Sequence, residues 1–121
     1  MTGRLIDWWR RRRFTRPRLK QVSYYTSRTD VPESVPRHTV AVVGTEVAPK
    51  WAIFECPCGR GHQLVVNLSA MRTPCWRLTT RKRGPSLYPS VDYKNAIRCH
   101  FWLRGAFVEW VPTRRRGDSV D

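Results

Sequence analysis

Residues 54–62 read Phe-Glu-Cys-Pro-Cys-Gly-Arg-Gly-His, and this stretch decides what kind of domain the chain can form. Two cysteines separated by one residue, in a turn loosened by two glycines, can face one tetrahedral ion. A histidine four positions after the second cysteine can reach the same centre. We therefore expect Cys56, Cys58 and His62 to bind zinc, which suits such ligands. The alternative is a pair of buried thiols in a turn.

A tetrahedral site needs two ligands beyond Cys56 and Cys58, and the candidates are His62, Cys75, Cys99 and His100. If residues 97–103 form a strand, Cys99 and His100 point to opposite faces and do not share an ion. Cys99 is preferred because thiolate is the softer donor. Cys75 or His100 is the alternative to His62. The predicted ligands, which would close the site and make it structural, are Cys56, Cys58, His62 and Cys99.

The rest of the sequence indicates a small, mostly β domain. With 121 residues, nine prolines and 26% charged residues, the chain can bury only a modest core, so a metal ion would help to hold it together. Short apolar or β-branched runs bounded by glycine, proline or polar residues predict strands. They are Thr39–Thr45, Lys50–Cys56, His62–Leu68, Cys75–Thr80, Ile97–Leu103 and Ala106–Val111. We expect a zinc-stabilised antiparallel sheet.

The domain organisation follows from composition. Residues 1–37 are expected to be a basic N-terminal arm and linker, with a short amphipathic helix at residues 4–13 and prolines at positions 32 and 36. Residues 38–112 would form the zinc-binding β domain. Residues 113–121 carry no periodicity and predict a disordered tail.

The net charge of +14 is concentrated near the start of the chain, where residues 1–20 hold eight Lys/Arg and one Asp. With Trp8 and Trp9 beside the Arg10–Arg13 run, this arm can attract phosphates and stack on bases. Nucleic acid is therefore a possible partner, and an acidic protein is an equal alternative.

Two absences place the chain in the cytoplasm. The sequence shows no signal peptide and no apolar run of the roughly 18–20 residues that a membrane span needs, so we expect no membrane association. In a reducing compartment a Cys-x-Cys pair favours metal binding over a disulfide.

A second stretch, Leu-Tyr-Pro-Ser-Val-Asp at residues 87–92, is followed by His100 ten residues after Ser90. A serine fixed behind a proline and a histidine on the face away from the metal can form a nucleophile and its general base. The alternative is a turn hydroxyl and a structural or metal-binding histidine.

Several motifs in order resemble the BubE-type peptidases of bacterial ubiquitination-like (Bub) operons. The resemblance covers roughly Thr39–Val111 and is carried by Cys56-Pro57-Cys58-Gly59 with Gly61-His62, Trp76-Arg77-Leu78, Leu87-Tyr88-Pro89-Ser90, and Cys99-His100-Phe101-Trp102-Leu103 with Gly105 and Trp110. Family members often have a cysteine at the position of Arg60 and more residues between the last cysteine and the histidine.

The resemblance implies a serine peptidase on a zinc-stabilised fold that trims or deconjugates a ubiquitin-like protein. Its partners would be that ubiquitin-like protein and the activating and conjugating enzymes encoded nearby in a bacterium. By position, Ser90 would be the nucleophile and His100 the base, with Asp92, Glu46 or Glu55 as the orienting acid. The functions left as alternatives are a zinc module that binds nucleic acid and a non-catalytic adaptor that binds an acidic protein.

Overall fold

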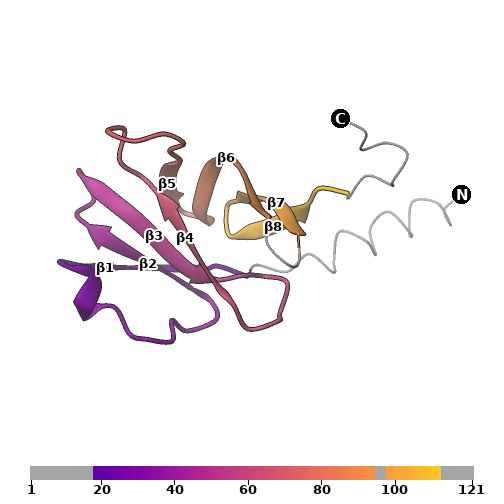
Figure 1. Cartoon of the computed structure of the whole chain (residues 1–121), viewed down its shortest axis with the longest axis horizontal. Coiled ribbons are helices and arrows are strands. Elements are labelled where there is room, and N and C mark those ends of the chain that lie inside the picture. Colours follow the sequence, from indigo (N-terminus) through magenta and orange to yellow (C-terminus); the bar gives the residue numbers. More distant parts are fainter. Residues whose placement is uncertain (1–17, 95–97, 113–121) are drawn as a thin grey trace, which may run out of the picture.

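The computed structural model of this protein describes residues 18–94 and 98–112. The described chain is mostly β, as the sequence predicts, and forms two four-stranded sheets (Figure 1). The first sheet has the order β1-β2-β3-β4 and the second the order β5-β6-β7-β8. No helix among the described residues is both long and apolar enough to cross a membrane.

The first sheet is built from β1 (Gln21–Tyr25), β2 (Thr39–Gly44), β3 (Pro49–Glu55) and β4 (Gln63–Asn67). β2, β3 and β4 pair antiparallel, whereas β1 pairs parallel to β2, which departs from the expected antiparallel sheet. β2 is buried along nearly its whole length, which explains its unbroken β-branched and apolar sequence.

The second sheet is an antiparallel meander of β5 (Arg77–Arg81), β6 (Gly84–Lys94), β7 (Arg98–Arg104) and β8 (Phe107–Trp110). Along β7, buried residues alternate with half-buried or exposed ones. This strand therefore has one face in the core and one face outside, as a half-buried antiparallel strand should.

The main core lies between the two sheets. Phe54 of β3 and Phe101 of β7 are completely buried and meet edge to face, with ring centroids 6.4 Å apart. Such aromatic contacts hold the sheets together across the sandwich. The other main contributors from the two sheets are Val40, Val42, Leu64, Val66, Leu87, Val91, Leu103 and Val108.

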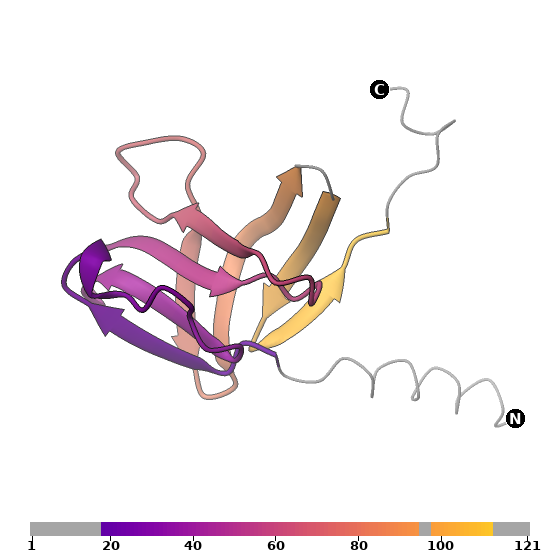
Figure 2. The same ribbon diagram turned by 60° about the horizontal axis from the view of Figure 1, so that its bottom comes forward.

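The described fold begins well before the predicted boundary at residue 38. Leu19 is 1% exposed in the main core, and β1 adds a strand to the first sheet. A short 3₁₀ helix (η1, Arg28–Asp30) follows, and Val35 packs with Ala41 and Ile53 on the outer face of that sheet. Figure 2 shows this segment crossing the sheet. The proline-containing stretch that was interpreted as a linker therefore packs against the outer face of the first sheet. The helix predicted at residues 4–13 and the tail at 113–121 lie outside the described residues.

The second sheet also contains a strand that the sequence concealed. β6 begins at Gly84 and runs for 11 residues, and it is not among the strands predicted from the sequence. Prolines at positions 85 and 89 argue against a strand in the sequence pattern, because proline cannot donate a hydrogen bond to a strand ladder. The structure accommodates them with a register shift between Leu87 and Val91 and a cis Tyr88–Pro89 bond.

Candidate active site and metal centre

The four residues named as metal ligands from the sequence lie together in the structure. The ligand atoms of Cys56, Cys58, His62 and Cys99 are all within 4.8 Å of one another, so this cluster is able to hold a metal ion. Three of them come from the β3–β4 connection in the first sheet, and Cys99 comes from β7 in the second. An ion bound here would join the two sheets.

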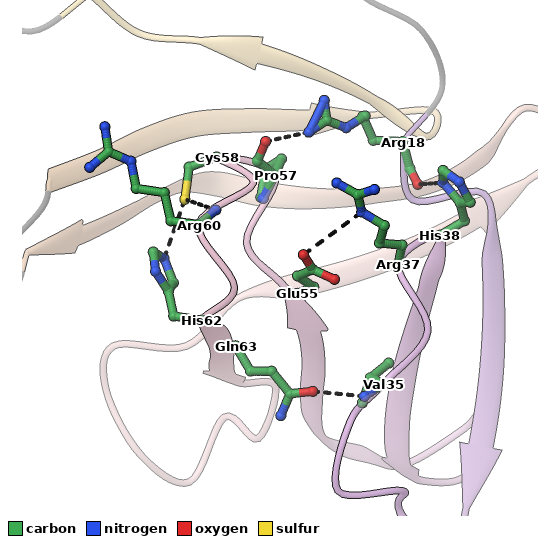
Figure 3. A network of polar contacts seen from close by, with 10 residues as sticks. All are labelled: Arg18, Val35, Arg37, His38, Glu55, Pro57, Cys58, Arg60, His62 and Gln63. Carbon is green, nitrogen blue, oxygen red and sulfur yellow. Dashed lines mark hydrogen bonds and ion pairs between the residues drawn. The ribbon is translucent and has the colours of Figure 1, made fainter.

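Local hydrogen bonds shape the loop that carries three of these residues. The Cys56 N–H donates to the His62 carbonyl at 2.8 Å, which closes the loop, and the Arg60 N–H donates to the Cys58 sulfur at 3.4 Å. The Arg18 guanidinium donates to the Pro57 carbonyl from outside the loop. Figure 3 shows Cys58 and His62 facing each other within this network. These hydrogen bonds fix the conformation of the loop that carries Cys56, Cys58 and His62.

Distances and chemistry both fit a tetrahedral ion. Cys58 Sγ and His62 Nε2 are 3.8 Å apart, close to the roughly 3.6 Å expected for two tetrahedral ligands at zinc bond lengths. Burial raises the pKa of the Cys56 and Cys99 thiols, because their charged forms lose hydration. A cation among the sulfurs would remove that penalty and favour the thiolates.

The two alternative ligands lie elsewhere. Cys75 is a half-buried free thiol and is not part of the cluster. His100 follows Cys99 directly, but the two side chains lie on opposite faces of β7, since Cys99 is 2% exposed in the core and His100 belongs to the outer face. His62 is instead the histidine of the cluster, and its ring stacks on Tyr93 with centroids 5.0 Å apart.

On the outer face of the second sheet, Ser90 and His100 form a direct contact. The Ser90 hydroxyl oxygen lies 2.9 Å from His100 Nε2, and both residues are half-buried. A serine hydroxyl hydrogen-bonded to an imidazole nitrogen is the arrangement that a nucleophile and its general base require.

The bulge in β6 brings this pair together. Between the Leu87–Leu103 and Val91–Phe101 pairs, three residues of β6 face only Trp102 of β7. Such a bulge re-aims side chains, and here the re-aimed residue is Ser90. The Ser90 carbonyl is fixed from the β5 side, because it accepts a hydrogen bond from the Trp76 indole at 3.1 Å. This anchor was not identified from the sequence, where Trp76 was only part of the motif pattern.

The three acids considered as orienting groups are placed very differently. Asp92 pairs directly across the strands with His100, but its carboxylate accepts two hydrogen bonds from Arg98, at 3.1 and 3.0 Å. Arg98 first, and the nearby charge of His100 less strongly, hold the pKa of Asp92 below its usual value. Glu55 pairs with Arg37 at 3.8 Å, and Glu46 is exposed in the β2–β3 connection. Asp92 is therefore the acid nearest to the pair.

Comparison with known sequence families assigns the chain. The family described as the bacterial ubiquitination-like system serine protease (BubE) matches residues 27–111, well over half of the 121 residues. The chain belongs to the BubE family. No curated protein and no solved structure matches it.

Membership of the BubE family agrees with the geometry of the second sheet. The matched region contains the metal cluster, Ser90 and His100, and it starts at residue 27, before the boundary expected from composition. A serine protease family name calls for a serine close to a base, and the Ser90–His100 pair is such a contact. The family description thus indicates a protease of a bacterial ubiquitination-like system.

Proposed function

We propose that this protein is a serine peptidase in which Ser90 is the nucleophile and His100 the general base. The observation that carries the proposal is the 2.9 Å contact between Ser90 Oγ and His100 Nε2 on an accessible sheet face. The serine protease description of the BubE family supports the same reaction class.

The chemistry follows from this contact. Ser90 Oγ attacks the carbonyl carbon of the scissile bond while His100 Nε2 takes the hydroxyl proton. The resulting imidazolium gives that proton to the leaving amine, and an acyl-serine remains. Water, deprotonated by His100, then hydrolyses the acyl group and restores Ser90. Asp92 lies across the strands from His100, and its negative charge stabilises the imidazolium through space.

We further propose that the metal ion is zinc and that it is structural. Three sulfurs and one imidazole nitrogen form the donor set that zinc prefers, and all four positions are filled by the protein. A closed site leaves no place for substrate. Its contribution to the reaction is to hold Cys99, and with it the adjacent His100, in position.

The substrate that we propose is the ubiquitin-like protein of the same bacterial system, either as a precursor with a C-terminal extension or conjugated to a target. The activating and conjugating enzymes of that system would then be functional partners in the cytoplasm. This assignment rests on the description of the BubE family.

The test is a Ser90→Ala variant. This change removes one oxygen and no member of the metal cluster, so the protein should fold and keep its metal. Cleavage of the ubiquitin-like protein carrying a C-terminal extension, followed by mass spectrometry, should fall by on the order of a million-fold, as for loss of other serine nucleophiles. A fluorophosphonate probe should label the wild type and leave the variant unlabelled.

Ser27→Ala is the matched control, because Ser27 is an exposed serine whose hydroxyl, within the described residues, bonds only to its neighbours Thr29 and Asp30. It should cleave and label as the wild type does. Wild-type cleavage rates in the Ser90→Ala protein would rule out the serine mechanism. Failure of the wild type to cleave any ubiquitin-like substrate would instead favour a binding function.

A further inference from the structure

A groove lies beside the Ser90–His100 pair on the outer face of the second sheet. It has a volume of about 230 Å³, below the range typical of sites for whole small molecules, and so it suits a single side chain. Its accessible lining is mainly apolar, and its lining residues include two aromatic residues and two arginines. The lining residues are Arg77, Thr79, Ser86, Leu87, Tyr88, Trp102, Leu103 and Arg104.

The groove and the candidate catalytic pair have the same structural origin. The β6 bulge places three residues opposite Trp102 alone, so Tyr88 has no register partner of its own on β7. The ring centroids of Tyr88 and Trp102 are 6.0 Å apart. Tyr88 is 66% exposed although its ring contacts Trp102. The exposed ring of Tyr88, in contact with Trp102, is therefore available to an apolar side chain from outside.

Strand geometry sets the distance between the groove and the scissile bond. Trp102 is two residues from His100 on the same face of β7, and Arg104 is four residues away. At about 3.3 Å per residue these are separations of about 7 and 13 Å. An extended peptide that runs along β7 on this face would therefore present its second residue from the scissile bond to the two aromatic rings and its fourth to Arg104.

The charge around the groove selects its occupant. Arg77 is exposed and lies at the level of the aromatic rings, because it pairs with Tyr88 across β5 and β6. Arg104 lies over the Trp102 ring at 4.5 Å and pairs with Glu109 at 3.6 Å. Beyond them, the β5–β6 turn carries three further basic residues at positions 81–83. An acidic group on the peptide would be attracted to this end of the groove.

We propose that this groove is the specificity site of the enzyme for an extended peptide segment with a large apolar side chain two residues from the scissile bond and a carboxylate two residues further. Trp102 and Tyr88 contact the apolar side chain, and Arg104 meets the carboxylate. The inference rests on the proposed peptidase function, and the experiment below separates the two.

Binding is measured on the Ser90→Ala protein, which cannot turn the peptide over. The probes are acetyl-Gly-Glu-Gly-Leu-Gly-Gly-amide, its reversed sequence, and versions with Lys in place of Glu or Ala in place of Leu. Titration is followed by NMR, with the indole N–H signal of Trp102, assigned with a Trp102→Phe variant, as the local reporter. One of the two Glu/Leu peptides should shift this signal, and the Ala version should bind at least about tenfold more weakly.

Charge reversal tests the acidic position. Arg104→Glu should weaken binding of the Glu peptide by about two- to fivefold, as expected for an exposed ion pair, and should strengthen binding of the Lys peptide. Phe107→Ala is the matched control, because Phe107 is an exposed aromatic residue of the same sheet that does not line the groove. It should leave all affinities unchanged.

The outcomes are distinguishable. Peptide binding at Trp102 without cleavage by the wild-type enzyme would keep the groove and overturn the peptidase proposal. Cleavage of the Glu/Leu peptide, its Lys version and its Ala version with equal kcat/KM, together with an unchanged Trp102 signal on titration, would overturn the specificity site and keep the peptidase proposal.

Discussion

His100 follows a residue of the metal cluster directly, yet its side chain belongs to a different site. Cys99 faces the core and the ion position, while His100 Nε2 lies 2.9 Å from Ser90 Oγ. His100→Ala should therefore abolish cleavage and fluorophosphonate labelling while the protein retains one metal ion per chain. Metal content is checked by mass spectrometry of the purified protein. A variant that loses its metal would show that His100 is a ligand and that the assignment to Ser90 is mistaken.

Asp92 gives a pH-dependent prediction. Because Arg98 holds its pKa below the usual value, Asp92 stabilises the fold above about pH 4, and this contribution disappears as the pH falls through the lowered pKa. Asp92→Asn should cost about 1 kcal/mol at pH 7, a value reduced for the partial exposure of the pair, and the cost should decrease progressively as the pH falls below about 4.

The prediction for Asp92 is checked by urea titrations of the variant and the wild type at several pH values. The quantity compared is the difference between their free energies of unfolding, because any effect of pH on metal binding is common to both proteins and cancels in this difference. Asp30→Asn is the control, because Asp30 is exposed and its carboxylate hydrogen-bonds to Ser27 in its own turn. A cost of Asp92→Asn that stays constant down to pH 2 would contradict the ion-pair explanation.

At the scale of elements, β1 is the segment whose role differs most from the sequence-based expectation. It pairs with β2 over five residues, and Leu19 before it enters the core. Deleting residues 1–30 should therefore remove a strand and unfold or strongly destabilise the protein. Deleting residues 1–17 removes none of the described chain, and we expect that variant to stay folded.

Thermal unfolding of the two truncations, with metal content measured in parallel, checks this prediction. The shorter truncation is also the test of the basic arm, since most of its Lys/Arg residues are lost without loss of β1. A folded and metal-loaded protein lacking residues 1–30 would show that β1 is dispensable, as the predicted boundary at residue 38 implied.

At the scale of the whole molecule, the metal cluster joins two sheets that are otherwise held by their apolar faces. A structural zinc ion contributes roughly 10–16 kcal/mol in small peptides, comparable to the total stability of a domain of this size. Strong chelators, Cys56→Ser or Cys99→Ser should therefore remove the metal and unfold the protein. Activity should be lost as well, although neither Ser90 nor His100 belongs to the cluster.

Cys75→Ser is the matched control for these substitutions. Cys75 is a free thiol outside the cluster, so its replacement should leave metal content and melting temperature close to the wild type. Equal loss of metal in Cys75→Ser and Cys99→Ser would mean that the cluster is drawn with the wrong fourth residue.

The sequence determined the features that depend on local chemistry and on periodicity. The Cys-x-Cys turn with its nearby histidine named three members of the cluster. Side chains in such a turn are close in space because they are close in the chain. Strand alternation separated Cys99 from His100, because neighbouring residues on a strand point to opposite faces. Six of the eight strands were visible in the same way.

Only the tertiary structure decided the features that depend on register. β1 was hidden because a five-residue parallel edge strand has a weak pattern, and β6 because its prolines imitate a turn. The distance from Ser90 to His100 is set by the bulge in β6, and the sequence pattern did not predict this bulge. The groove beside the pair exists for the same reason. A contact between strands depends on how they pair, and pairing is fixed by the packing of the whole sandwich.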